Sequence, residues 1–284
     1  VNYWAKLCLF IPERAAMSEL TNPKYLLTNQ YKNAANLNAR IQLHERFSVN
    51  KYDWQRWVFD HFTILPRRGR ILEIGCGPGE LWRKNGDRIP EGWDIVLSDF
   101  SPGMLQEARQ HLQGIQGRFT FQQADAQAIP FANEHFDAVI ANHMLYHVPD
   151  RAKALAEIRR VLRSGGRFYA ATNGQKHLLE LHELISTFVT DSAKLWGASI
   201  QISFRLESGK EELSQSFAQV TLDRYEDALV VTEVEPLLAY ILSAPLAIAL
   251  DSSTIKQLTE HIQQEIASNG AFHITKETGL FEAF

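Results

Sequence analysis

The stretch of sequence that decides the fold is residues 73–79, which read EIGCGPG. It continues residues 70–74, a short run rich in apolar side chains that is typical of a buried strand. Three alternating glycines let the backbone turn sharply and approach a ligand closely. A helix is expected to begin at Glu80, and the N-terminus of a helix favours polar or anionic groups. The stretch therefore predicts a site for a nucleotide-like ligand.

Two familiar phosphate-binding loops do not fit these glycines. The dinucleotide fingerprint G-x-G-x-x-G would start at Gly75 and need a glycine at position 80, where the chain has Glu80. A P-loop would need a glycine followed by lysine and then serine or threonine, and no such pair follows the stretch. A nicotinamide-dependent oxidoreductase is thus the least favoured enzyme class.

Strands and helices alternate around this loop. Strands are expected at residues 70–74, 94–98, 119–124, 136–141 and 167–172, and helices over 54–65, from 80, over 104–112 and over 150–162. Ser101 and Pro102 suit the N-cap and first position of the third helix. The glycine pair at 165–166 suits the C-terminal cap of the fourth. The alternation predicts a parallel sheet with helices on both faces.

The pattern changes beyond Gly174. A long helix is expected over residues 177–195, strand material over 217–232 with a turn near residues 226–227, a helix over 254–267 and a closing strand over 272–284. Neither an internal repeat nor a linker is visible in the sequence. One elaborated domain is therefore expected rather than two.

Composition excludes several function classes. The 284 residues are 45% hydrophobic and 22% charged, with a formal net charge of −4, which is ordinary for a globular domain and gives no electrostatic footprint for nucleic acid. Cys8 and Cys76 form no disulfide framework, so a reducing compartment, the cytoplasm, is expected. The longest apolar stretch, 236–250, is shorter than the roughly 18 residues of a membrane span. Because Met17 opens a more typical polar start, residues 1–16 are expected to be an expression remnant or an upstream extension.

Five motifs in order give the chain a family resemblance. Residues 73–79 are an acidic residue followed by G-x-G-x-G, and Asp99 ends the next expected strand. The segments ADA at 124–126, FDAVIAN at 136–142 and EIRRVLRSGG at 157–166 follow. Together they cover about residues 70–173 and resemble the class I S-adenosylmethionine-dependent methyltransferases.

The resemblance implies an α/β fold with a doubly wound, mostly parallel seven-stranded sheet, helices on both faces and an antiparallel last strand. It also implies an N-terminal helical cover and an inserted helical substrate cap. Within one domain over 17–284, the expected parts are the cover at 17–66, the cofactor-binding core at 67–173, the cap at 174–216 and the C-terminal strands and helix at 217–284.

The implied cofactor is S-adenosylmethionine, with S-adenosylhomocysteine as product and no metal. Asp99 would accept hydrogen bonds from both ribose hydroxyls, and an arginine fork at Arg46 suits the methionine carboxylate, although Arg46 also fits a solvated helix face. The remaining residues carried over from the family motifs are Glu73, Gly75, Cys76 and Gly77 of the loop, Phe100, Met104, Asp125 and Ala126 around the adenine, and Asn142 after the fourth strand.

Methyl transfer needs alignment more than acid–base chemistry, because the carbon is already activated by sulfonium. His143 and His147 lie where the fourth strand ends, which makes them the candidate catalytic residues. His147 could instead orient the turn that it shares with Pro149. The scattered histidines show no metal-ligand spacing.

The apolar segment 174–216 favours a small organic acceptor, methylated on O, N or C. Two alternatives stay open. One is a methyltransferase that acts on RNA or protein, and the other is a regulator that binds the cofactor without turnover. The sequence contains no pattern that specifies a partner protein or an oligomeric state.

Overall fold

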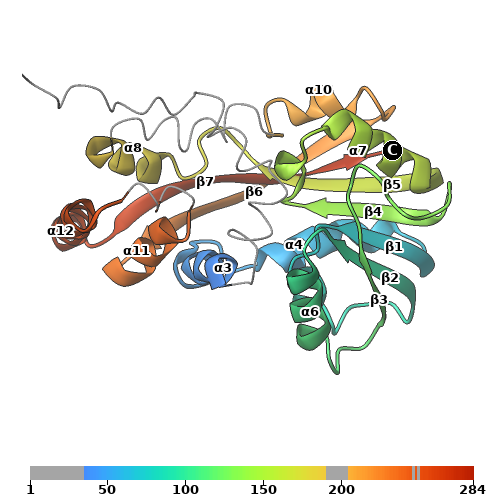
Figure 1. The fold of residues 1–284 in the computed structure, drawn as a ribbon, viewed down its shortest axis with the longest axis horizontal. Helices are drawn as coiled ribbons and strands as arrows, with labels where there is room; N and C mark the ends of the chain where they lie inside the picture. Colours follow the sequence, from blue (N-terminus) through green and yellow to red (C-terminus); the bar gives the residue numbers. More distant parts are fainter. Residues whose placement is uncertain (1–34, 190–203, 245–246, 248–249) are drawn as a thin grey trace, which may run out of the picture.

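One seven-stranded sheet organises the computed structural model, which describes residues 35–189, 204–244, 247 and 250–284 (Figure 1). The strands are β1 (Arg68–Ile74), β2 (Gly92–Asp99), β3 (Arg118–Gln123), β4 (Phe136–Asn142), β5 (Leu162–Asn173), β6 (Val220–Val231) and β7 (Phe272–Ala283). Their order is β3-β2-β1-β4-β5-β7-β6. β1 to β5 are parallel, and β7 lies antiparallel between β5 and β6. The expected sheet, with its antiparallel last strand, is confirmed.

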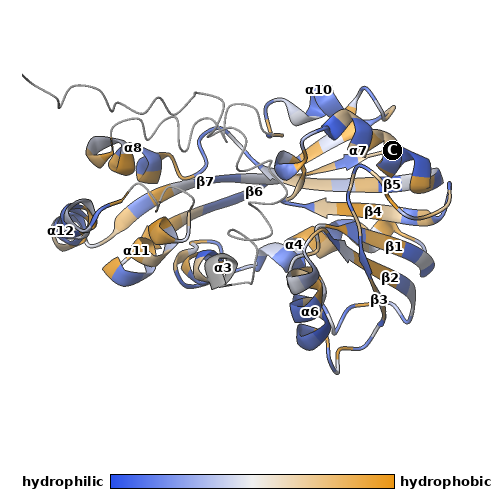
Figure 2. Cartoon of the chain, in the orientation of Figure 1, coloured by the Kyte–Doolittle hydropathy of each residue, from blue (hydrophilic) through white to orange (hydrophobic). Residues whose placement is uncertain are grey.

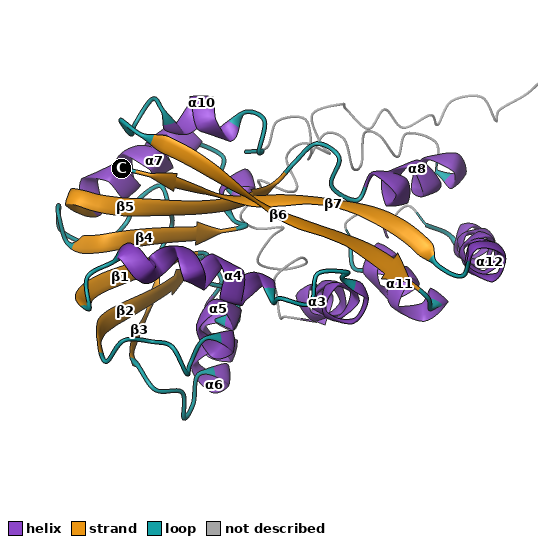
Figure 3. Ribbon diagram, turned by 180° about the vertical axis from the view of Figure 1, so that it is seen from behind, coloured by secondary structure: helices purple, strands orange, loops and turns teal. Residues whose placement is uncertain are grey.

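Helices cover both faces of the parallel strands, as Figure 3 shows from behind. One face carries α4 (Trp54–Asp60), α5 (Glu80–Lys84) and α6 (Pro102–His111), and the other carries α7 (Arg151–Val161) and α10 (Gly209–Leu213). In β4, Ala138 and Ile140 pack in the apolar cluster beneath α4, α5 and α6. Val139 and Ala141 point to the other face and pack in the cluster beneath α7 and α10. Because both faces of the strand are buried, nearly all of its residues are apolar. Each large side chain that is buried in this way contributes roughly 1.5–3 kcal/mol to the stability of the fold.

A second group of helices surrounds the far ends of β6 and β7, at the left of Figures 1 and 2. These helices are α3 (Ala35–Phe47), α8 (Leu179–Phe188), α11 (Val234–Leu242) and α12 (Ser252–Asn269). β5 pairs with β7 only over residues 278–283, whereas β6 pairs with all of it. The part of β6 and β7 that extends beyond β5 packs with the four helices around a shared apolar cluster that includes Leu43, Leu229 and Ile274. No helix of the described residues is long and apolar enough to cross a membrane.

The expected turn near residues 226–227 is wrong. β6 continues through it, with Glu226 opposite Glu277 and Asp227 opposite Lys276. Asp227 is fully buried and forms an ion pair with Lys276. An acidic pair in a sequence favours a turn, but a cation on the neighbouring strand allows this carboxylate to lie inside a sheet.

The expected glycine cap of α7 is also wrong. The helix ends at Val161, and Leu162 is already extended (φ −74°, ψ 135°). The glycines at 165–166 lie within β5, where the pairing with β4 shifts register and Gly165 has a φ of 75°. These glycines therefore allow an irregularity in the strand and do not cap the helix. Of the long helix expected over 177–195, α8 is described, and residues 190–195 lie outside the described part of the chain, as do residues 1–16.

Candidate active site

The site lies where β1 and β4 end side by side, because the strand order reverses between these two strands. Ligands of open α/β sheets bind in the crevice at such a point. Here the loop after β1 meets the loop after β4: a side chain at Gly75 would place its Cβ 2.7 Å from the Cβ of Met144. Gly75 also has a φ of 67°. Only glycine fits both demands.

Asp99 holds the glycine loop in place from the end of β2. The backbone N–H of Gly77 donates to its Oδ2 at 2.9 Å, and that of Ser101 donates to its Oδ1 at 2.8 Å. Gly77 has a φ of 53°, so the loop is fixed in a left-handed conformation at this point. Burial raises the pKa of Asp99. Each carboxylate oxygen can accept more than one hydrogen bond, so capacity remains for the two ribose hydroxyls.

Glu73 and Cys76 lie deeper beneath the loop. Trp82 donates its indole N–H to Oε2 of Glu73 at 2.7 Å, and burial raises the pKa of Glu73 to about 8. Burial likewise raises the pKa of the Cys76 thiol. The backbone N–H of Cys76 donates to the carbonyl of Ser98, which ties the loop to β2. Burial therefore keeps both groups in their neutral forms at physiological pH.

The predicted adenine side is made by residues that follow β2 and β3. Phe100, next to Asp99, is 37% exposed. Met104 is buried in the first turn of α6, and its backbone N–H donates to the side chain of the N-cap residue Ser101. Asp125 accepts hydrogen bonds from the backbone and side chain of Gln127, with Ala126 buried between them. Their contacts with adenine stay predictions.

Two buried polar atoms without a partner mark the other end of the site. Among the described residues, Asn142 Oδ1 and Trp54 Nε1 are both buried without a hydrogen bond. Asn142 donates through Nδ2 to Gln55 Oε1 at 3.0 Å, which places the end of β4 against α4. An unpaired buried polar atom is costly, so this acceptor and this donor suit an ammonium and a carboxylate respectively. The residues present therefore fit the methionine end of S-adenosylmethionine.

Arg46 does not contact this part of the site. It forms an ion pair with Glu233 at 2.5 Å, and both side chains are about half exposed (47% and 48%). The predicted contact with the methionine carboxylate would require Arg46 to leave that partner, and it stays a prediction. The sequence predicts the helix that carries Trp54 and Gln55 but does not mark either residue as part of the site. The reason is that tryptophans at helical spacing are equally typical of core packing.

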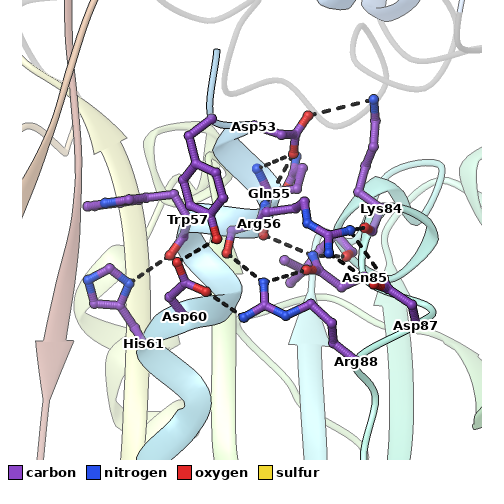
Figure 4. Close-up of polar contacts among 12 residues, drawn as sticks. Asp53, Gln55, Arg56, Trp57, Asp60, His61, Lys84, Asn85, Asp87 and Arg88 are labelled. Carbon is purple, nitrogen blue, oxygen red and sulfur yellow. Dashed lines mark hydrogen bonds and ion pairs between the residues drawn. The ribbon is translucent and has the colours of Figure 1, made fainter. Parts of the chain in front are cut away.

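A network of ion pairs and hydrogen bonds fixes α4 over the site (Figure 4). Asp53 caps the helix by accepting from the backbone N–H groups of Gln55 and Arg56. Arg56 pairs with Asp87, and Asn85 donates to the backbone carbonyl of Gln55. The other ion pairs of the network are Arg88 with Asp60 and Lys84 with Asp53. The network ties α4 to α5 and to the segment after it, and so holds Gln55 against Asn142 and Trp54 against His143.

His143 leaves β4 in a left-handed conformation, with a φ of 56°. Its ring lies 5.3 Å from that of Trp54, and its Nε2 lies 3.4 Å from Oγ1 of Thr278. Burial, with a smaller effect of Lys276, lowers the pKa of His143 to about 4, so the imidazole is neutral at physiological pH. His147 lies in the short 3-10 helix η3 (Leu145–His147), its ring 4.6 Å from that of Tyr146. The structure thus brings His143 against α4.

Comparisons with known proteins relate this chain to methyltransferases. Residues 72–170 match the methyltransferase domain family. The chain is 34% identical over 116 residues to the ubiquinone/menaquinone biosynthesis C-methyltransferase UbiE of Proteus mirabilis, and 37% identical over 117 residues to that of Serratia proteamaculans. Each match covers 40% of this chain and 46% of the relative, so the chain spans less than half the length of these curated relatives.

Two solved structures resemble the whole fold. Phosphoethanolamine N-methyltransferase 2 of Haemonchus contortus, in complex with S-adenosyl-L-methionine, is 17% identical with a TM-score of 0.59, over 92% of this chain and 59% of that one. The YcgJ protein of Bacillus subtilis is 17% identical with a TM-score of 0.54, over 80% of this chain and 96% of that one. Among the described residues, no group of His, Cys, Asp and Glu side chains is arranged to hold a metal ion.

Proposed function

We propose that this chain, which carries a class I methyltransferase domain over residues 72–170, transfers the methyl group of S-adenosylmethionine to a small organic acceptor. The observation that carries the proposal is the glycine loop at the reversal of strand order, closed by the hydrogen bond from Gly77 to Asp99. The family match covers the same loop.

The residues of this site position and enclose the cofactor. When bound, S-adenosylmethionine supplies a methyl carbon that is already activated by a sulfonium. Asp99 would accept from the ribose, while Trp54 donates to the methionine carboxylate and Asn142 accepts from the ammonium. Helix α4, which Gln55 joins to Asn142, would cover that end of the cofactor and help to exclude water. Holding the reacting atoms in line is the main contribution of the protein to such a displacement.

Carbon is the acceptor atom that we favour. The relatives that are 34% and 37% identical to this chain over 116 and 117 residues are named C-methyltransferases. A carbon nucleophile gains electron density from a neighbouring hydroxyl, and a neutral histidine such as His143 can hydrogen-bond to that group. The net charge of −4 favours a small acceptor over a polynucleotide. We place the enzyme in the cytoplasm, because two cysteines in 284 residues suit a reducing compartment.

Turnover with an isotope-labelled cofactor tests the proposal. The full chain is incubated with methyl-labelled S-adenosylmethionine and a panel of small acceptors that offer O, N or C nucleophiles. We expect label in one acceptor class, with one S-adenosylhomocysteine formed for each methyl transferred. Cofactor binding without transfer to any acceptor would favour a regulator, and label in RNA or protein instead would contradict a small-molecule acceptor.

A further inference from the structure

Three histidines from distant parts of the sequence gather beside the site. His44 comes from α3, His143 follows β4, and His177 precedes α8. The ring centroids of His44 and His177 are 6.3 Å apart, and His143 lies close enough to both to lower their pKa values. We call these three residues the histidine cluster. Because His143 directly follows Asn142, the cluster adjoins the predicted methionine end of the cofactor.

Lys276 and Asp227 are two charged groups beside the cluster, and they neutralise each other. Lys276 of β7 pairs with the buried Asp227 of β6 and donates to Oγ of Ser48 at 3.1 Å. Its ammonium also lies 5.8 Å from the ring of Tyr225. Burial first, and then this ammonium, lower the pKa values of the histidines, to about 3 for His44 and about 4 for His143. The cluster therefore presents neutral imidazoles at physiological pH.

The hydrogen bonds of the neutral rings indicate where their protons lie. The backbone N–H of Glu277 donates to Nδ1 of His177 at 3.3 Å, which leaves the His177 proton on Nε2. Thr278 donates its single hydroxyl proton to the carbonyl of Thr172 at 3.2 Å. We therefore assign His143 the tautomer that donates from Nε2 to the Thr278 oxygen, with Nδ1 as an acceptor.

His177 thus offers a free donor and His143 a free acceptor. Within the described part of the chain, the side-chain hydrogen bonds of His177 and His143 use the other nitrogen of each ring, so Nε2 of His177 and Nδ1 of His143 stay available. Among the same described residues, Nδ1 of His44 is buried without a hydrogen-bond partner. A hydroxyl group both donates and accepts, whereas an ammonium only donates and a carboxylate only accepts.

We propose that the histidine cluster is the acceptor-binding site and selects an uncharged acceptor through a hydroxyl group, which donates to His143 Nδ1 and accepts from His177 Nε2. The inference rests on the proposed function, whose acceptor it defines. An ammonium would leave His177 unmatched and add a positive charge beside Lys276. The apolar residues around the cluster, among them Trp54 and Tyr240, suit a hydrophobic skeleton behind the hydroxyl.

A matched pair of probes tests the selection. 2-Naphthylmethanol and 2-naphthylmethylammonium share one skeleton and differ in the hydroxyl and the ammonium. Calorimetric titration uses the full chain loaded with S-adenosylhomocysteine, so that no turnover occurs. We expect the alcohol to bind and the ammonium to bind at least tenfold more weakly. His177→Phe should weaken alcohol binding about tenfold, the loss of roughly one hydrogen bond, while His177→Gln, which can still donate, retains most of it.

The control variant is His135→Phe, because His135 lies at the opposite end of β4, beside Arg70. It should leave both probe affinities unchanged. Equal affinity for the two probes, no binding of the alcohol, or an unchanged affinity in His177→Phe would overturn the inference. Binding of S-adenosylhomocysteine is measured separately: a protein that binds the alcohol with this dependence on His177 but does not bind S-adenosylhomocysteine would contradict the proposed function and leave the cluster as a hydroxyl site.

Discussion

Glu73 shows how burial changes the chemistry of a single residue in the site. Its side chain is 2% exposed, and Trp82 donates to it. Burial raises its pKa from an ordinary 4.5 to about 8, so the folded protein keeps a proton that the unfolded chain releases. Such a group stabilises the fold fully below its unfolded pKa and loses this contribution as pH rises through its folded pKa.

Glu73→Gln should therefore be more stable than the parent protein at alkaline pH. The amide still accepts from Trp82 and never ionises. We expect the difference in the free energy of unfolding to grow from near zero below about pH 4.5 to about 2–4 kcal/mol near pH 8. Urea unfolding of both proteins across this range, without cofactor, measures it. A difference that does not change with pH would show that Glu73 ionises normally.

At the scale of single residues, prediction from the sequence succeeds where one local rule fixes the backbone conformation. The glycines at 75 and 77 have the positive φ values that their pattern implied, and Ser101 caps α6 as expected. The histidine cluster could not be foreseen, because His44 and His177 are brought together only by the tertiary packing of α3 and α8. The spacing of residues along the sequence does not indicate such a contact.

At the scale of elements, α4 links the scaffold to the site. Apolar spacing predicted this helix and its end before Pro66, and the structure continues it as the short helix η2 (His61–Ile64). The network that joins α4 to α5 could not be predicted, because its charged side chains are of the kind found on any solvated helix. The turn expected at residues 226–227 failed for a related reason, since the partner of Asp227 comes from a strand far along the sequence.

Trp54→Phe tests the role of α4 in binding. The change removes the buried Nε1 donor, which has no partner among the described residues, and keeps a ring against His143. We expect S-adenosylmethionine affinity to fall roughly tenfold or more, since a hydrogen bond to a charged group contributes about 1.5–3 kcal/mol. Trp57→Phe is the matched control on the same helix and should leave affinity unchanged. Calorimetry that found equal effects of the two variants would remove Trp54 from the site.

At the scale of the whole molecule, β6 and β7 carry the four helices that extend the fold beyond the cofactor core (Figure 1). The sequence predicted both strands and the helices α8 and α12, but it predicted neither α11 nor the packing of the four helices around one apolar cluster, because that packing depends on tertiary contacts. The ion pair of Lys276 and Asp227 lies inside it, with side-chain exposures of 7% and 0%. Breaking a buried pair leaves one charge without compensation.

Lys276→Met should therefore destabilise the fold by about 3–5 kcal/mol, because Asp227 would remain buried and unpaired. Asp227→Asn in the same chain removes that charge, and its side-chain oxygen can still accept from the backbone N–H of Asn50. The double variant should recover most of the loss. Chemical denaturation of the parent, single and double variants measures both effects. A double variant as unstable as the single one would mean that lost packing, not the unpaired charge, causes the destabilisation.

The most direct measurement for the whole account is calorimetric titration of S-adenosylmethionine into the parent protein and two aspartate variants. Asp99→Ala removes the carboxylate that binds the glycine loop, and Asp94→Ala changes an exposed residue of the same strand that pairs with Arg118. We predict that Asp99→Ala stays folded and loses about 1.5–3 kcal/mol of binding free energy, while Asp94→Ala binds as the parent does. A folded Asp99→Ala with unchanged affinity, or a parent protein that does not bind S-adenosylmethionine, would contradict the account.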